Sequence, residues 1–221
     1  MNARQKALAA IAREGALLVY PLQNRPEPRS LWHVLHPRSA MHWAWDSEAD
    51  PRVAALWQLR EQLARSREVV YSKWWRGRAV FFSQPVFTAM LAELRSRELF
   101  DELSSEARTL LELLEEDSPV STKELRKRAD LQGRLLERPW SQALAALFTR
   151  GLIVGTGEVD DGAFPSLAVG ATRWIFEDLW TEAERGPTEE SRALLSRVFP
   201  PKGPFGKQWG KTLDALPSRV A

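Results

Sequence analysis

The sequence contains no cysteine, and this absence excludes disulfide bonds, thiolate metal sites and a cysteine nucleophile. It also lacks a long hydrophobic run. Arg13 and Glu14 interrupt the apolar stretch near the start before it reaches the length of a signal peptide, and nowhere do about 18 apolar residues follow one another as a membrane span requires. We therefore expect a cytoplasmic protein that is not integral to a membrane.

A large excess of charge of either sign is missing as well. The formal net charge is +2, from 31 basic and 29 acidic residues, so any affinity for a polyanion must come from local clustering. What the chain does have is length and aromatic residues. Its 221 residues can bury a core of one large or two small domains, and we expect most of its ten tryptophans to lie in that core.

Several segments have apolar residues at helical spacing. Asp50 and Pro51 combine an N-cap with proline at the first helical position, which predicts a helix over residues 51–66. The same reasoning predicts helices over residues 1–18, 85–97, 173–184 and 188–199. β-Branched and aromatic residues on both sides of Gly77 suggest a β-hairpin, although its first strand could instead extend the preceding helix. The tail from residue 200 is expected to be partly disordered.

The middle of the chain has the most specific organisation. Ser121 with Glu124 forms a capping box, Gly151 ends a helix, and Gly155 with Gly157 suggests a turn. The expected order is helix 104–116, helix 121–129, turn 130–133, helix 137–150, strand 152–154, glycine turn 155–157 and the start of a return strand. This order is typical of a winged helix.

We therefore predict a mainly α protein with a small β component, built on a winged helix-turn-helix core with N-terminal and C-terminal helical segments. The expected divisions are a helical region with a short hairpin over residues 1–102, a winged-helix domain over 103–170, and a helical segment with a tail over 171–221.

The layout resembles the bacterial AlkZ-related winged-helix proteins, relatives of helix-turn-helix DNA glycosylases. The resemblance covers most of residues 15–185, and the segments that carry it are 17–22, Ser30-Leu31-Trp32, Trp43-Ala44-Trp45, 77–83, 110–114, 121–125, Ala143-Leu144, 151–154 and Phe164-Pro165-Ser166. It implies a winged-helix fold and a DNA-related role. The related glycosylases use a Gln, an apolar residue and then Gln or Asp, whereas the nearest strings here are Gln58-Leu59-Arg60 and Gln62-Leu63-Ala64. The resemblance therefore brings no catalytic residue with it.

Residues 121–150 carry seven basic side chains against three acidic ones. If Trp140, Leu144, Leu147 and Phe148 face inward, a polar face with short side chains lies opposite them. Such a face fits a major groove, because Arg and Gln can each make paired hydrogen bonds to a base edge. The predicted nucleic-acid contacts are Lys123, Arg126, Lys127, Arg134, Arg138, Ser141, Gln142 and Thr149. The alternatives are an ordinary solvated face or a protein-interaction surface.

A second basic and aromatic patch precedes the first in the chain. It comprises Lys73, Trp74, Trp75, Arg76 and Arg78, which could follow a phosphate backbone or stack on an exposed base. The alternative is that the tryptophans are packing residues covered by arginine stems.

Other polar residues are weaker candidates for chemistry. His33 and His36 have a spacing that can place both on one helical face, and His42 is near, but the surrounding Trp and Pro residues favour packing histidines over a metal site. Asp46 and Asp50 are the candidate acid or base groups, because burial beside tryptophan would raise a carboxylate pKa. The simpler interpretation of Asp50 is a helix cap.

The sequence thus predicts a winged-helix protein that binds double-stranded DNA, without an evident catalytic site and without a metal or other cofactor. A glycosylase acting on damaged bases and an adaptor that binds a protein partner are the alternatives.

Overall fold

The computed structural model describes residues 1–43, 50–97, 99–161 and 165–216. The helices of these ranges are α1 (Ala3–Glu14), α2 (Leu31–Leu35), α3 (Pro51–Ser66), α4 (Gln84–Arg95), α5 (Ser105–Glu116), α6 (Thr122–Arg128), the 3-10 turn η1 (Arg134–Leu136), α7 (Glu137–Thr149), α8 (Thr172–Ile175), α9 (Glu177–Ala183), α10 (Glu189–Val198) and α11 (Pro204–Asp214). The strands are β1 (Ala16–Leu18), β2 (Val69–Trp75), β3 (Arg78–Ser83), β4 (Val120–Ser121), β5 (Ile153–Val159) and β6 (Ser166–Ala171).

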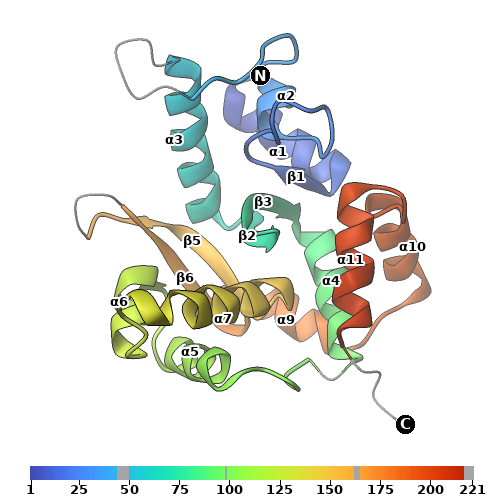
Figure 1. Ribbon diagram of the computed structural model, residues 1–221. Helices are drawn as coiled ribbons and strands as arrows, with labels where there is room; N and C mark the ends of the chain where they lie inside the picture. The colour runs from blue at the N-terminus through green and yellow to red at the C-terminus, as the bar shows by residue number, and fades with distance from the viewer. Residues whose placement is uncertain (44–49, 98, 162–164, 217–221) are drawn as a thin grey trace.

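The protein is mainly α with a small β component, as predicted. The described strands form one antiparallel sheet of six strands in the order β1-β3-β2-β5-β6-β4. In Figure 1, α1 to α3 lie at one end of the molecule, α5 to α7 at the other, and α4, α10 and α11 along one side. Within the described ranges, no helix is long and apolar enough to cross a membrane.

The N-terminal elements follow local signals, with one exception. Helix α3 begins at the predicted proline, with Asp50 as its N-cap. The first helix is shorter than predicted, because Gly15 has a φ of 79° and ends it. The apolar residues that follow, Ala16–Leu18, form β1 and pair with β3 instead of continuing the helix.

The hairpin around Gly77 is confirmed. Its strands β2 and β3 are joined by Arg76 and Gly77, both with positive φ, which suits a two-residue hairpin turn. Strand β2 also pairs with β5 through Tyr71 and Gly155, so the sheet continues across residue 103, the expected domain boundary. The division into three parts stays a prediction.

The predicted glycine turn after α7 is wrong. Gly155 and Gly157 lie inside β5, where the register shifts between them, and the return strand is β6 at Ser166–Ala171. A hairpin after Gly151 is nevertheless present. It is a longer one, and β4 pairs with β6 on its outer side.

The C-terminal part also differs from the expectation. The predicted helix over 173–184 is divided into α8 and α9, because Phe176 leaves the helical region with a φ of –131°. The tail that was expected to be partly disordered contains α11, which buries Phe205 and Trp209. These aromatic rings contact Phe199, at the end of α10.

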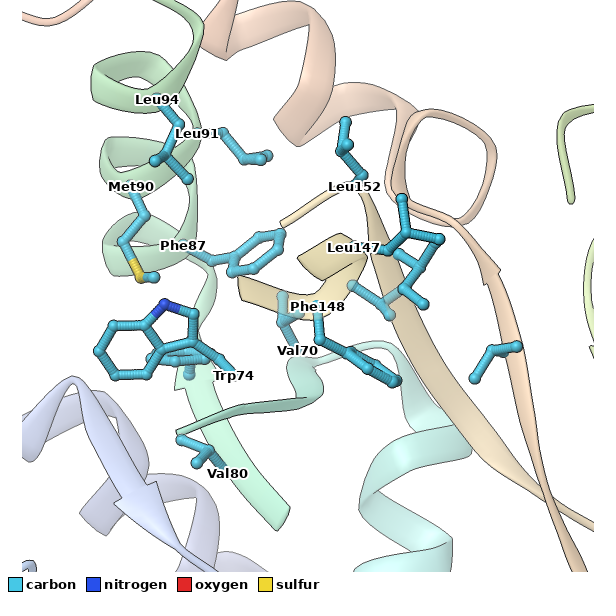
Figure 2. Packing of buried hydrophobic residues seen from close by; sticks show 14 of the residues in the cluster. Val70, Trp74, Val80, Phe87, Met90, Leu91, Leu94, Leu147, Phe148 and Leu152 are labelled. Atoms are coloured by element: carbon cyan, nitrogen blue, oxygen red, sulfur yellow. The ribbon is translucent and has the colours of Figure 1, made fainter. Parts of the chain in front are cut away.

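Among the described residues, the larger of two hydrophobic clusters joins the sheet to α4, α5, α7 and the C-terminal helices. Figure 2 shows Trp74 of β2, Phe87 of α4 and Leu147 and Phe148 of α7 within it. Trp140, Leu147 and Phe148 are buried, as predicted, whereas Leu144 is only partly buried. This packing fixes which face of α7 is left to solvent.

Candidate nucleic-acid interface

Helix α7 presents a polar face to solvent. It packs against α5 on one side and against β2 and β5 on the other. Arg138, Ser141, Gln142 and Ala145 are exposed on the remaining face, and Thr149 is half-buried at its edge. The long side chains of Arg138 and Gln142 are four residues apart and therefore share this face. The structure thus brings together the expected groove-facing residues of α7.

Arg126 connects the residues of the turn before α7. The Nε of Arg126 donates to the carbonyl oxygen of Leu131 at 2.8 Å, and its Nη2 lies 2.8 Å from the Glu137 carboxylate. Its guanidinium also lies 5.6 Å from the ring centroid of Trp140. Arg126 is therefore a brace between α6 and α7, with less capacity left for a phosphate than the sequence interpretation assumed.

The two lysines that were expected to contact phosphates, Lys123 and Lys127, differ in their intramolecular contacts. Lys127 is exposed on α6, whereas the Nζ of Lys123 donates to the carbonyl oxygen of Asp161 at 2.5 Å. The Ser121 hydroxyl donates to the Asp161 carboxylate at 2.6 Å, and this hydrogen bond lowers the pKa of Asp161. These contacts tie the end of the β5–β6 hairpin to the start of α6.

A cleft of about 810 Å³ opens beside α7, between the turn and the sheet. The cationic side chains that line it come from three parts of the chain and are Lys73, Lys123, Arg126 and Arg134. Two aromatic residues of α7, Trp140 and Phe148, contribute to its apolar wall. Burial lowers the pKa of Lys73, and the positive charge of Arg60 lowers it further. Lys73 comes from β2, so the sequence did not indicate that it would join the basic residues of α6 and the turn.

The predicted basic and aromatic patch is therefore divided among different surroundings. Trp74 and Trp75 are each only 2% exposed and belong to the core, so the prediction that they stack on a base is wrong. The indole of Trp75 donates to the carbonyl oxygen of Pro204 at 3.3 Å. Arg76 and Arg78 are exposed at the hairpin turn, and Arg76 covers Trp75 with its guanidinium 5.0 Å from the ring centroid. The tryptophans are therefore packing residues, and an arginine covers one of them, as the alternative interpretation of the patch predicts.

His33 and His36 have local structural roles, and His42 is exposed. The ring of His33 contacts the hydroxyl of Ser30 at 3.0 Å in the capping box of α2, and His36 lies 4.6 Å from Trp32 between ring centroids. Burial lowers the pKa of both histidines. Among the residues that the structure describes, no three His, Asp or Glu side chains are grouped so that they could hold a metal ion.

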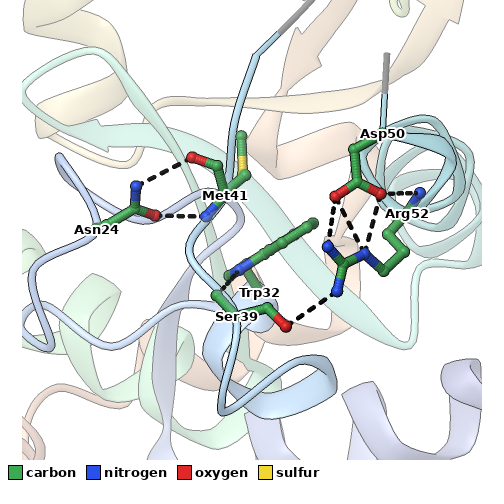
Figure 3. A network of polar contacts seen from close by, with 6 residues as sticks. All are labelled: Asn24, Trp32, Ser39, Met41, Asp50 and Arg52. Carbon is green, nitrogen blue, oxygen red and sulfur yellow. Dashed lines mark hydrogen bonds and ion pairs between the residues drawn. The ribbon is translucent and has the colours of Figure 1, made fainter. Parts of the chain in front are cut away.

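Asp50 is a helix cap and an ion-pair partner (Figure 3). Its carboxylate accepts from the backbone N–H of Arg52 at 2.9 Å and pairs with the guanidinium of Arg52 at 2.7 Å. These hydrogen bonds lower the pKa of Asp50 to about 2. The prediction of a raised pKa is therefore wrong for Asp50, because Arg52 stabilises the ionised form. Asp46 lies outside the described residues.

Replacing Asp50 by Asn should reveal this ion pair in the pH dependence of stability. Asn is as good an N-cap as Asp, so Asp50→Asn removes the charge and keeps the cap. The pKa of Asp50 falls from 3.8 to about 2 on folding, so the charge stabilises the fold above pH 3.8 and that contribution disappears as the pH falls toward 2. Wild type should have the higher Tm near neutral pH, and the two proteins should converge in acid. A difference that does not change with pH would contradict this.

The two glutamine-containing strings of α3 have neither a carboxylate nor an amide at their third positions. Gln58 and Gln62 are exposed, and Arg60 is 8% exposed and paired with Glu158 of β5. The side chain at the third position of the first string is therefore a buried cation held by a carboxylate. It cannot act as the carboxylate or amide that would position a water.

The geometry defines a mainly helical protein with a polar helix face beside a cleft that several cationic side chains line. The chain matches the AlkZ-related family over residues 1–201 and belongs to that family. The resemblance inferred from the sequence is confirmed at this level. No curated protein and no solved structure matches the chain.

Proposed function

We propose that residues 103–170 form a winged helix that binds double-stranded DNA, with α7 in the major groove. The element order α5, β4, α6, α7, β5, β6 supports the winged-helix assignment. The observation that carries the function is the exposed face of α7, where Arg138 and Gln142 can each make paired hydrogen bonds to a base edge. The AlkZ-related family adds a relation to DNA repair.

Cationic side chains beside α7 could contact the phosphate backbone of the bound duplex. The cleft along α7 carries Lys73 and Arg134, and Lys127 is exposed on the neighbouring helix. A strand that borders the major groove would pass along these cations while α7 lies in the groove. Phosphate contacts fix the position of the protein on the duplex, and base contacts supply the sequence preference.

Binding to a duplex by fluorescence anisotropy at several salt concentrations tests this function. Lys127→Ala should weaken binding on all sequences and reduce the slope of log K against log salt by about one unit. Arg138→Ala should weaken binding by ~1–3 kcal/mol, mainly on preferred sequences. Lys202→Ala, which removes an equal charge from an exposed residue between α10 and α11, is the matched control and should change neither quantity.

Circular dichroism must first show that each variant is folded, since Arg138 is two residues from the buried Trp140. A folded wild type that binds no duplex at low salt would refute the function. So would Lys127→Ala and Arg138→Ala variants that bind as well as Lys202→Ala. A protein-interaction adaptor would then become the better proposal for this face.

A glycosylase is the second candidate, and family membership is the observation that favours it. We infer binding without catalysis, because neither glutamine-containing string of α3 has Gln or Asp at its third position, where Arg60 and Ala64 stand. Incubation of the protein with alkylated duplex DNA should then release no free base above background. Release that survives Asp46→Asn and Asp50→Asn would establish an enzyme and exclude both aspartates.

A further inference from the structure

Leu135 is the most exposed large apolar side chain of the described residues. Its side chain is 93% exposed, compared with 53% for Trp43 and 49% for Trp174. It lies in η1, directly before α7. Covering this side chain with a partner would be favourable, because the hydrophobic effect acts on all of the apolar surface that is removed from water.

The backbone around Leu135 is held in place before any partner binds. Gly133 has a φ of 91°, which suits glycine, and its carbonyl oxygen accepts from the N–H of Leu136 at 3.2 Å. Arg126 adds a hydrogen bond to Leu131 and an ion pair to Glu137 on the two sides of this turn. The turn therefore presents Leu135 in a defined position, and little further ordering is needed on binding.

The surroundings of Leu135 suit DNA better than an apolar protein surface. Since η1 leads directly into α7, Leu135 and Arg138 are three residues apart and lie on the same side, followed by Gln142 one turn further on. Arg134 and Arg138 are both exposed beside the leucine, and the carboxylate between them in sequence, Glu137, is paired with Arg126. This arrangement complements DNA, because the arginines can contact phosphates while the leucine contacts an apolar group in the major groove.

We propose that Leu135 is a specificity-determining residue that contacts the C5-methyl group of thymine. This inference rests on the proposed function, with α7 in the major groove. The thymine methyl is the apolar group that a base pair displays there, and apolar side chains recognise it. Leucine cannot form a hydrogen bond to a base edge, so its contribution is limited to this contact.

The test compares thymine with deoxyuridine, which lacks only the methyl group. The tightest duplexes are first selected from a random library with the wild-type protein, and each thymine is then replaced in turn by deoxyuridine. Wild type should lose about fourfold in affinity at one or two positions, the effect of burying one methyl-sized group. Leu135→Ala should bind both forms of the duplex equally at those positions.

Two further variants keep the result interpretable. Leu135→Met retains an apolar side chain and should keep the discrimination. Phe100→Ala removes an exposed apolar ring elsewhere on the protein, 42% exposed, and should keep it as well. Because Leu135 makes no contribution to the core, Leu135→Ala should unfold at the wild-type temperature.

The outcomes separate this inference from the function on which it rests. Wild type that binds DNA but does not distinguish thymine from deoxyuridine overturns the inference and leaves the proposed function intact. The same holds if Leu135→Ala keeps the discrimination. Wild type that binds no duplex at all overturns both.

Discussion

Replacement of Trp74 by Ala is expected to reduce the free energy of unfolding by ~3–5 kcal/mol, the range for removing a large aromatic side chain from a core. Trp74 is 2% exposed. Its ring centroid lies 5.6 Å from that of Phe82 and 5.5 Å from that of Phe199. The indole therefore joins the sheet to Phe199 at the end of α10. Figure 2 shows it among the buried side chains of the larger cluster. Because protein interiors are closely packed, removing the indole should leave a cavity.

Urea unfolding monitored by circular dichroism would measure this loss. The control is Trp57→Ala on α3, where the side chain is 42% exposed and the expected loss is below about 1 kcal/mol. Trp74→Phe keeps most of the apolar contact and provides a folded variant if Trp74→Ala does not fold. A Trp74→Ala variant as stable as wild type but weaker in DNA binding would contradict its place in the core and restore the stacking interpretation.

Local signals were sufficient where a few neighbouring residues determine the structure. Asp50 and Pro51 mark the start of α3 because the cap and the proline both act within the first turn. Ser121 likewise accepts from the backbone N–H of Glu124 at 3.1 Å, which is the N-cap half of the predicted capping box, whereas the Glu124 carboxylate accepts from Arg128. The buried face of α7 was predictable for the same reason, because helical periodicity is a local property.

Contacts between distant residues explain the errors. Gly155 was expected to form a turn, but it is a strand residue opposite Tyr71, and a Cβ at Gly155 would lie 2.2 Å from the Tyr71 ring. The glycine is needed for the close approach of β2 and β5, which are far apart in sequence. The composition of the tail similarly suggested disorder, whereas Phe205 packs on Trp74 and Trp75.

At the candidate interface, too, the local features were predictable and the contacts between distant residues were not. The polar face of α7 followed from periodicity, but Lys73 reaches the cleft only because β2 pairs with β5. A count of charges could not show that Arg126 braces the turn while Lys127 stays exposed. Leu135 was missed because an apolar residue beside a helix is ordinarily expected to be buried, and only the three-dimensional arrangement shows that nothing covers it.

The pair formed by Arg60 of α3 and Glu158 of β5 connects the N-terminal helices to the hairpin beside α7. Their side chains are only 10% and 16% exposed, and the backbone N–H of Glu158 donates to Glu61 at 2.9 Å. The guanidinium also lies 6.0 Å from the ring centroid of Tyr71, which pairs with β5. This contact therefore fixes the hairpin relative to the cleft.

Glu158→Ala is expected to reduce the free energy of unfolding by ~3 kcal/mol, the low end of the range for breaking a buried ion pair, since both side chains retain some contact with water. The loss arises because Arg60 stays buried as an uncompensated charge. Replacing both residues, as Arg60→Met with Glu158→Leu, should therefore restore most of the stability. Glu184→Ala removes a carboxylate that is 50% exposed from its pair with Arg95 and should have an effect below about 1 kcal/mol. Urea unfolding of the four proteins would contradict the assignment if Glu158→Ala matched Glu184→Ala, or if the double variant were less stable than Glu158→Ala.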